Sequence, residues 1–209
     1  MGAMMMRAAI LVAAALVLSG STTRAQQKKP SPDGHAAVEV GGKYAGATPT
    51  YVGGRWIEIS YGRPIKRGRD LWGAGDAYGR ALNAGAPVWR AGADNSTYLM
   101  AQVPMVINGT RIEPGGYSMF IDLKPDDWTL IVSSWQPQRF FNPGNRAELW
   151  GSYGYTADKD VVRMQMTLGT LPFSMEQLTW AFVDMSDTGG KMAIMWDTVM
   201  ATVPFTIAQ

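Results

Sequence analysis

Short apolar stretches separated by turn-forming residues account for most of the chain. Stretches rich in Val, Ile, Thr, Tyr, Trp and Phe alternate with clusters of Gly, Pro, Asn and Asp, which is typical of strands and turns. Between residues 163 and 168, apolar residues at even positions alternate with polar residues at odd positions. This predicts a strand with one face in a core and the other in water. The predicted strands cover residues 56–61, 105–107, 110–112, 117–123, 128–134, 161–168, 176–185, 191–196 and 199–207.

Turn sequences and the lack of a helical period define the fold class. Asn108-Gly109 joins two apolar stretches and favours a type I′ hairpin, because both positions of that turn need positive φ. No stretch keeps a period of 3.6 over ten residues, and the nearest, 70–82, is interrupted by glycines. The chain is therefore predicted to be all-β: a single antiparallel β-sandwich, jelly-roll or Ig-like, of roughly eight to ten strands.

Two long segments do not fit as strands. Residues 62–87 are rich in glycine and arginine, and residues 136–155 are rich in aromatic side chains. Loops of this length in a compact domain are usually functional or disordered. Their aromatic content argues against disorder, so we expect both to be ordered.

The N-terminus has the layout of a secretory signal peptide. Arg7 precedes an apolar run of 11 residues, 8–18, and Thr23-Arg24-Ala25 offers a cleavage site. The run is shorter than the roughly 20 residues of a membrane-spanning helix. We expect residues 1–25 to be the signal, 26–34 a flexible tether and 35–209 one β-sandwich domain. The mature protein is then periplasmic or extracellular and does not span a membrane.

Composition excludes several kinds of chemistry. The chain has 19 basic and 17 acidic residues, and two of the arginines lie in the predicted signal, so the mature protein is neutral and lacks a basic footprint for nucleic acid. The absence of cysteine excludes thiolate and zinc–cysteine sites. The one histidine, His35, lies in a segment rich in Pro, Gly and Ser near the mature N-terminus, which argues against a triad or a histidine metal site. No metal or cofactor is expected.

Several motifs together resemble a known family. They are residues 60–69 (Ser-Tyr-Gly-Arg-Pro to Gly-Arg), 88–94 (Val-Trp-Arg-Ala-Gly-Ala-Asp) and 114–120 (Pro-Gly-Gly-Tyr-Ser-Met-Phe). Over about residues 31–207 the chain resembles the DUF-2911 family, exported bacterial domains of unknown function. The resemblance implies an exported single-domain β protein and no established activity. Residues 80–87 and the loop 136–155 look longer than is usual for the family, so the ligand here is expected to differ if these loops line a site.

The strongest chemical signal is a cluster of arginines between residues 63 and 90. Guanidinium groups suit carboxylates and phosphates, and nearby glycines would let backbone N–H groups approach an anion. This favours a site for an anionic or polyhydroxylated ligand. The alternative is that the arginines pair with Asp70, Asp76 and Asp94 and fasten the long loops to the sandwich. The candidate ligand-binding residues are Tyr61, Arg63, Arg69, Trp89, Arg90 and Asp94.

Aromatic residues and carboxylates are less decisive. Strands favour aromatics, so Trp56, Trp128, Trp180 and Trp196 are predicted to be core residues. The aromatics in or beside the loop 136–155 are compatible with either loop packing or carbohydrate binding. The Asp158-Lys159-Asp160 sequence lacks the further ligands of a calcium loop.

Three classes of function stay open. The first is a non-catalytic module that binds a small anionic or polyhydroxylated ligand or a partner in the cell envelope. The second is a carboxylate-dependent hydrolase, which requires an Asp or Glu pair that converges on the arginines. The third is a structural or assembly protein, in which the arginines are all paired internally and no open cleft exists.

Overall fold

The computed structural model describes residues 29–208. The predicted signal peptide, residues 1–25, lies outside these residues, as does the first part of the predicted tether. Asp33 and Gly34, the last two residues of that tether, belong to the first strand, β1 (Asp33–Val40). Within residues 29–208 no helix has both the length and the apolar character needed to cross a membrane.

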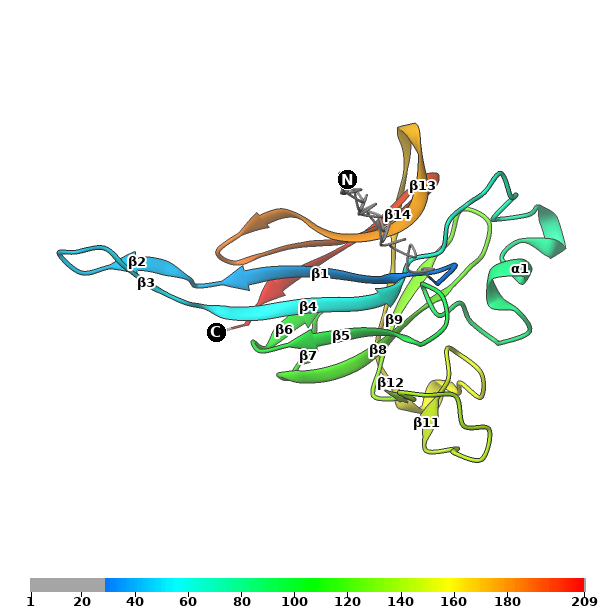
Figure 1. The fold of residues 1–209 in the computed structure, drawn as a ribbon, viewed down its shortest axis with the longest axis horizontal. Coiled ribbons are helices and arrows are strands. Elements are labelled where there is room, and N and C mark those ends of the chain that lie inside the picture. The colour runs from blue at the N-terminus through cyan, green and yellow to red at the C-terminus, as the bar shows by residue number, and fades with distance from the viewer. Residues whose placement is uncertain (1–28, 209) are drawn as a thin grey trace, which may run out of the picture.

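Two antiparallel sheets form the body of the protein (Figure 1). The larger has the strand order β1-β4-β5-β8-β9-β12, with β4 (Arg55–Gly62), β5 (Thr97–Ala101), β8 (Gly115–Asp122), β9 (Thr129–Ser133) and β12 (Asp160–Gln165). The smaller has the order β13-β14-β6-β7, with β13 (Thr167–Ser186), β14 (Gly189–Ile207), β6 (Met105–Ile107) and β7 (Thr110–Ile112). The prediction of an all-β sandwich is confirmed.

The remaining elements are short. The hairpin β2 (Lys43–Ala45) and β3 (Thr50–Val52) extends the β1–β4 pair, and β10 (Gln136–Pro137) pairs in parallel with β11 (Glu148–Leu149). The helical turns are η1 (Gly75–Ala77), α1 (Arg80–Asn83) and η2 (Ala157–Lys159). In Figure 1 the β2–β3 hairpin projects at one end of the sandwich, and α1 and β11 lie at the other. Both long loops therefore sit at the same end.

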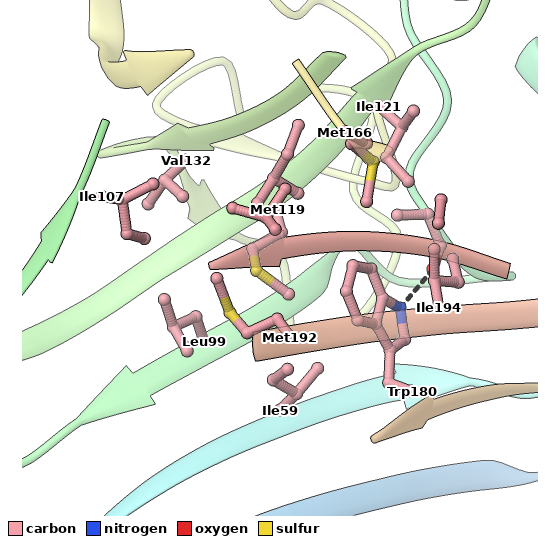
Figure 2. Close-up of a cluster of buried hydrophobic side chains, with 14 of the residues drawn as sticks. Ile59, Leu99, Ile107, Met119, Ile121, Val132, Met166, Trp180, Met192 and Ile194 are labelled. Atoms are coloured by element: carbon pink, nitrogen blue, oxygen red, sulfur yellow. Dashed lines mark hydrogen bonds between the residues drawn. The ribbon is translucent and has the colours of Figure 1, made fainter. Parts of the chain in front are cut away.

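The core lies between the two sheets and is filled by apolar side chains from both. Figure 2 shows Leu99 and Met119 of the larger sheet facing Met192 and Ile194 of the smaller one, and all four are buried. Trp180 lies in the same cluster, where its indole N–H donates to the carbonyl of Ala91 at 2.9 Å. Burial of this apolar surface is the main favourable contribution to folding.

Four tryptophans pack together at the end of the core that carries the long loops. The rings of Trp72, Trp89, Trp128 and Trp196 lie 4.7–6.3 Å from one another in the contacting pairs. The indole N–H of Trp128 donates to the hydroxyl of Tyr78 at 2.9 Å. Trp72 and Tyr78 come from the glycine-rich segment 62–87, so this cluster explains why that segment is ordered without strands of its own.

The predicted Asn-Gly hairpin is confirmed. It joins β6 and β7, with φ of +48° at Asn108 and +73° at Gly109. The predicted strand 161–168 is two strands instead, because the chain passes from the larger to the smaller sheet at Met166. The N–H of Met166 donates to the carbonyl of Trp128 at 2.8 Å, which holds this crossover in place.

Trp56 was predicted to be a core residue, and the structure shows that this is wrong. It is 40% exposed, because Ile57 and Ile59 of β4 point into the core and the residues that alternate with them point outward. Strands β1 and β5 were not predicted at all. The outer face of the larger sheet therefore carries side chains that the sequence did not place.

Candidate functional site

The arginine-rich segment is fastened to the smaller sheet. Arg63 donates from Nε to the carbonyl of Leu178 and from Nη2 to the hydroxyl of Thr179, both at 3.1 Å. Lys66 forms an ion pair with Asp197 at 2.5 Å. Leu178 and Thr179 lie on β13 and Asp197 on β14, so these contacts tie the segment to both strands.

Tyr61 and Trp89 connect the same region to the core. The Tyr61 hydroxyl accepts a hydrogen bond from the N–H of Trp180 at 3.0 Å and lies 3.5 Å from the carbonyl of that residue. The Trp89 side chain is almost completely buried, and its indole N–H donates to the carbonyl of Gly92 at 3.3 Å. Both side chains therefore hold main-chain groups in place, Tyr61 those of Trp180 and Trp89 that of Gly92.

The turn 91–94 is held in a strained conformation from several directions. Ala91 and Asp94 have φ of +54° and +61°, a region that costs non-glycine residues of the order of 1–3 kcal/mol. The carbonyl of Ala91 accepts from the Thr97 hydroxyl at 3.1 Å and from the Trp180 indole. The carbonyl of Asp94 accepts from Arg90 Nη1 at 2.6 Å. These donors over-determine the backbone conformation of the turn.

A glycine lets this turn pack against the end of β4. A Cβ placed on Gly62 would lie 2.1 Å from the carbonyl oxygen of Ala93, closer than any real contact. The backbone of β4 therefore approaches the turn at a distance that only glycine permits. This contact sets the turn beside the outer face of the larger sheet.

A cleft of about 780 Å³ opens where the turn, the outer sheet face and the loop 136–155 meet. We call it the sheet-face cleft and the loop 136–155 the aromatic loop. Asp94 is exposed in the cleft, and within residues 29–208 its carboxylate has no hydrogen-bond partner. The volume lies in the range of about 300–1,000 Å³ that is usual for small-molecule sites. The cleft is lined by Lys29, residues 33–35, 60–62 and 93–96, Tyr98, residues 137–140 and Trp150.

Two of the three basic groups that line this cleft have acidic neighbours, and the third, Arg139, forms no ion pair within residues 29–208. Lys29 lies 3.4 Å from Asp33, and His35 lies 3.2 Å from Glu58, which faces outward on β4. His35 itself belongs to strand β1 and not to a loop. The pairing leaves a cleft wall of mixed polar and aromatic character with little net charge.

Three contacts anchor the aromatic loop to the sandwich. The Ser96 hydroxyl donates to the carbonyl of Gly151, and the Ser152 hydroxyl donates to the carbonyl of Val88 at 2.7 Å. The Arg90 guanidinium lies 5.0 Å from the centre of the exposed Tyr153 ring. Arg90 therefore joins the turn 91–94 to the aromatic loop, and both sides of the cleft depend on it.

The far end of the aromatic loop is fixed by a charged network. The Tyr155 hydroxyl donates to Asp160 at 2.7 Å, and Arg163 bridges Asp160 and Asp122 at 3.0 and 3.2 Å. Burial, and then the hydrogen bond to Asp160, raise the pKa of Tyr155 above its ordinary value. Asp160 is engaged in this structural role, and residues 29–208 contain no group of three or more His, Cys, Asp or Glu side chains arranged for a metal.

A smaller hollow of about 390 Å³, the arginine pocket, lies beside the turn 91–94 and includes Arg67 and Arg69. Arg69 donates to the carbonyls of Ile65 and Lys66 at 2.7 and 3.0 Å, and its guanidinium lies 5.7 Å from the Trp196 ring. No carboxylate lines this pocket among residues 29–208. The carboxylate pair that a hydrolase needs does not converge on these arginines.

Comparison with known families assigns the chain. The family model described as "Protein of unknown function (DUF2911)" matches residues 45–205. The chain belongs to the DUF2911 family. No curated protein and no solved structure matches it. The match runs from the end of β2 to near the end of β14, so the DUF2911 region contains both long loops and the turn 91–94.

The six candidate residues of this DUF2911 chain fall into three groups. Tyr61 and Asp94 line the sheet-face cleft, and Arg69 lines the arginine pocket. Trp89, Arg63 and Arg90 line neither of them. The arginines make internal contacts, as the alternative interpretation expected, but their partners are carbonyls and a threonine and not the carboxylates of Asp70, Asp76 and Asp94.

Sequence reasoning missed several residues of the cleft. Ser60, Tyr98 and Asn95 line it, and none was proposed. The signal available was the alternation in β4, where Ser60 lies between two buried residues and so points outward. Without β5, that signal could not be connected to Tyr98, which pairs directly with Ser60 in the sheet.

Proposed function

We propose that this protein is a non-catalytic binding module whose sheet-face cleft takes a neutral polyhydroxylated ligand such as a short saccharide. The observation that carries the proposal is the cleft itself, whose lining combines aromatic rings with an unpaired carboxylate. Phe140 is 75% exposed in the wall of this cleft, where the Arg139 guanidinium lies 5.6 Å from the centre of its ring. Trp150 and Tyr98 add further ring surface to the same cleft.

The chemistry of a sugar complements this wall. A pyranose presents apolar C–H groups on its faces and hydroxyls around its edge. The rings of Phe140 and Trp150 offer apolar surface to a face, while the Asp94 carboxylate accepts from hydroxyls. Two of the three basic groups that line the cleft have acidic neighbours, and the unpaired Asp94 carboxylate offsets the charge of Arg139, so a neutral ligand fits better than an anion.

A binding role also fits the carboxylates better than hydrolysis does. Asp33 and Asp94 both line the cleft, but Asp33 accepts a hydrogen bond from Lys29. A glycosidase needs two carboxyl groups that flank the scissile bond. With export directed by the predicted signal, the ligand would come from the periplasm or the cell exterior.

The first test is a thermal-shift titration of residues 26–209 with two disaccharides, cellobiose and diacetylchitobiose. A ligand at 100 times its dissociation constant stabilises the folded state by about 2.7 kcal/mol, which raises the melting temperature by about 5–10 °C. Asp94→Asn tolerates the positive φ and removes the charge. Since charged hydrogen bonds exceed neutral ones by about 1 kcal/mol, the variant should bind about fivefold more weakly.

Asp76→Asn is the matched control, because Asp76 is exposed in η1 and lies outside the cleft. It should bind as the wild type does. The proposal fails if neither sugar shifts the melting temperature, or if the two aspartate variants bind equally well.

A second candidate function is supported by the arginine pocket. Two guanidinium groups line it without a carboxylate, so we infer that an anion of the size of phosphate or citrate would fit there. Titration with inorganic phosphate and citrate tests this candidate. Arg67→Asn should abolish a shift, because Asn tolerates the φ of +51° at that position. A shift that survives this substitution would place the anion elsewhere.

A further inference from the structure

A third hollow lies within the aromatic loop, next to the sheet-face cleft. We call it the loop pocket; its volume is about 620 Å³. Its apolar wall is formed by Trp135, Phe141, Trp150 and Tyr153, and Glu148 is one of its polar residues. Phe141 is 63% exposed and packs edge-on against Trp150, with 5.9 Å between the ring centres.

The wall of the loop pocket is built to stay in place. Gln138 is buried, and its side-chain N–H groups lie 2.9–3.1 Å from the carbonyls of Asn142, Asn145 and Glu148. Its side-chain carbonyl accepts from the N–H of Asn142 at 2.8 Å. One side chain thus satisfies backbone groups around the whole bend, and a pre-formed wall lowers the entropic cost of binding.

The loop pocket and the sheet-face cleft are adjacent. Trp150 and Gln138 line both of them. Phe140 lines the sheet-face cleft, and the next residue, Phe141, lines the loop pocket. Each hollow is large enough for one small molecule, and the two together exceed the usual range for a single one.

The polar groups of the loop pocket are also balanced in charge. Asn145 donates to the Glu148 carboxylate at 2.9 Å, and Arg146 lies on the same pocket. The pattern of aromatic rings with a neutral polar rim therefore repeats the pattern of the sheet-face cleft.

The geometry points to a linear chain of sugar units as the ligand, which crosses Trp150 and occupies both hollows. This inference rests on the proposed function, since the sheet-face cleft holds the first units of the chain. The loop pocket then acts as a further subsite that selects oligosaccharides over disaccharides. Phe141 supplies the apolar face of that subsite.

Isothermal titration calorimetry with β-1,4-linked oligomers of glucose and of N-acetylglucosamine, two, four and six units long, tests the inference. Phe140→Ala and Phe141→Ala are a matched pair, because both rings are largely exposed and their removal leaves the core intact. Affinity should rise with length. Phe140→Ala should weaken binding of every oligomer roughly two- to tenfold, whereas Phe141→Ala should weaken only the longer ones by that factor.

The outcomes separate the inference from the proposed function. If disaccharides and hexamers bind equally well, or if Phe141→Ala binds the hexamer as the wild type does, the loop pocket is not a subsite and the proposed function stands. If no oligomer binds at any length, both are overturned. Circular dichroism spectra of the two variants check that each is folded.

Discussion

Arg90 is the side chain on which both sides of the sheet-face cleft depend, and its replacement by alanine is the most informative perturbation. The side chain is 9% exposed, donates to the carbonyl of Asp94 at 2.6 Å and lies over the Tyr153 ring. It also fills the space beside Gly151, where an added Cβ would lie 2.4 Å from the guanidinium carbon. Arg90→Ala removes all three contacts at once.

The expected loss follows from these contacts. A hydrogen bond from a charged donor contributes about 1.5–3 kcal/mol, and a partly desolvated cation–π contact contributes about 0.5–2 kcal/mol. The free energy of unfolding should therefore fall by roughly 3 kcal/mol. For a domain of about 150–250 residues this lowers the melting temperature by about 6–12 °C.

Thermal and urea unfolding, followed by circular dichroism, measure the change. Arg69→Ala is the comparison, because Arg69 is exposed and its hydrogen bonds reach only carbonyls of its own segment. Its guanidinium also lies 5.7 Å from the Trp196 ring, so its loss should cost about 1 kcal/mol. Arg90→Lys keeps the charge without the planar fork and should fall between wild type and Arg90→Ala. An Arg90→Ala protein that melts no lower than Arg69→Ala would refute the role given to Arg90.

Two further predictions concern the turn between β6 and β7 and the ion pair on β14. Gly109→Val should lower the free energy of unfolding by about 1–2 kcal/mol, because Gly109 has a φ of +73°. No atom lies near its Cβ position, so the substitution measures backbone strain alone. A urea midpoint equal to that of the wild type would contradict this. The pKa of Asp197 is lowered below its ordinary value, chiefly by the hydrogen bond from Lys66, so the pair stabilises the protein above about pH 4 and that stability is lost as the pH falls further. Lys66→Met should show a shallower loss between about pH 5 and 2, and equal acid profiles of the two proteins would count against the pair.

The parts of the fold that sequence could predict are those with a local cause. The hairpin at Asn108-Gly109 needs two successive residues with positive φ, and Asn followed by Gly is a residue pair that meets this requirement. The glycines of the segment 70–82 likewise prevent a long helix, and the helical residues found there belong to the short turns η1 and α1. These features depend little on what packs against them.

The strands and outward residues of the larger sheet could not be predicted in the same way. Strands are recognised by apolar residues that alternate with polar ones, but the outward residues Trp56, Tyr98 and Met100 are themselves apolar or aromatic. β5 therefore shows no clear period, and Trp56 resembles a core residue. Of these outward residues, Tyr98 lines the sheet-face cleft, so the missed strand also concealed one of the rings of the cleft.

The arginines show why a motif can be recognised without its role being understood. Guanidinium groups near glycines suit an anion and suit backbone carbonyls equally well, and only the fold decides which is within reach. Here the carbonyl of Leu178 reaches Arg63 from a strand more than a hundred residues away, and the carbonyl of Asp94 reaches Arg90 across the turn. Neither distance is visible in the sequence.

The residues that carry the family resemblance therefore serve mainly as a scaffold. Trp89 and Arg90 hold the carbonyls of the turn 91–94, and Tyr61 holds β13. Of these motifs, only Asp94 presents an unpaired charged group to the sheet-face cleft.

The apolar wall comes instead from the aromatic loop, which is anchored by serine hydroxyls bonded to backbone carbonyls and by the Arg90–Tyr153 contact. Because the turn is over-determined without the loop, the loop can change in length and composition while the turn is kept. If the proposed function holds, we expect ligand specificity to depend on residues 136–155 and stability to depend on the motifs.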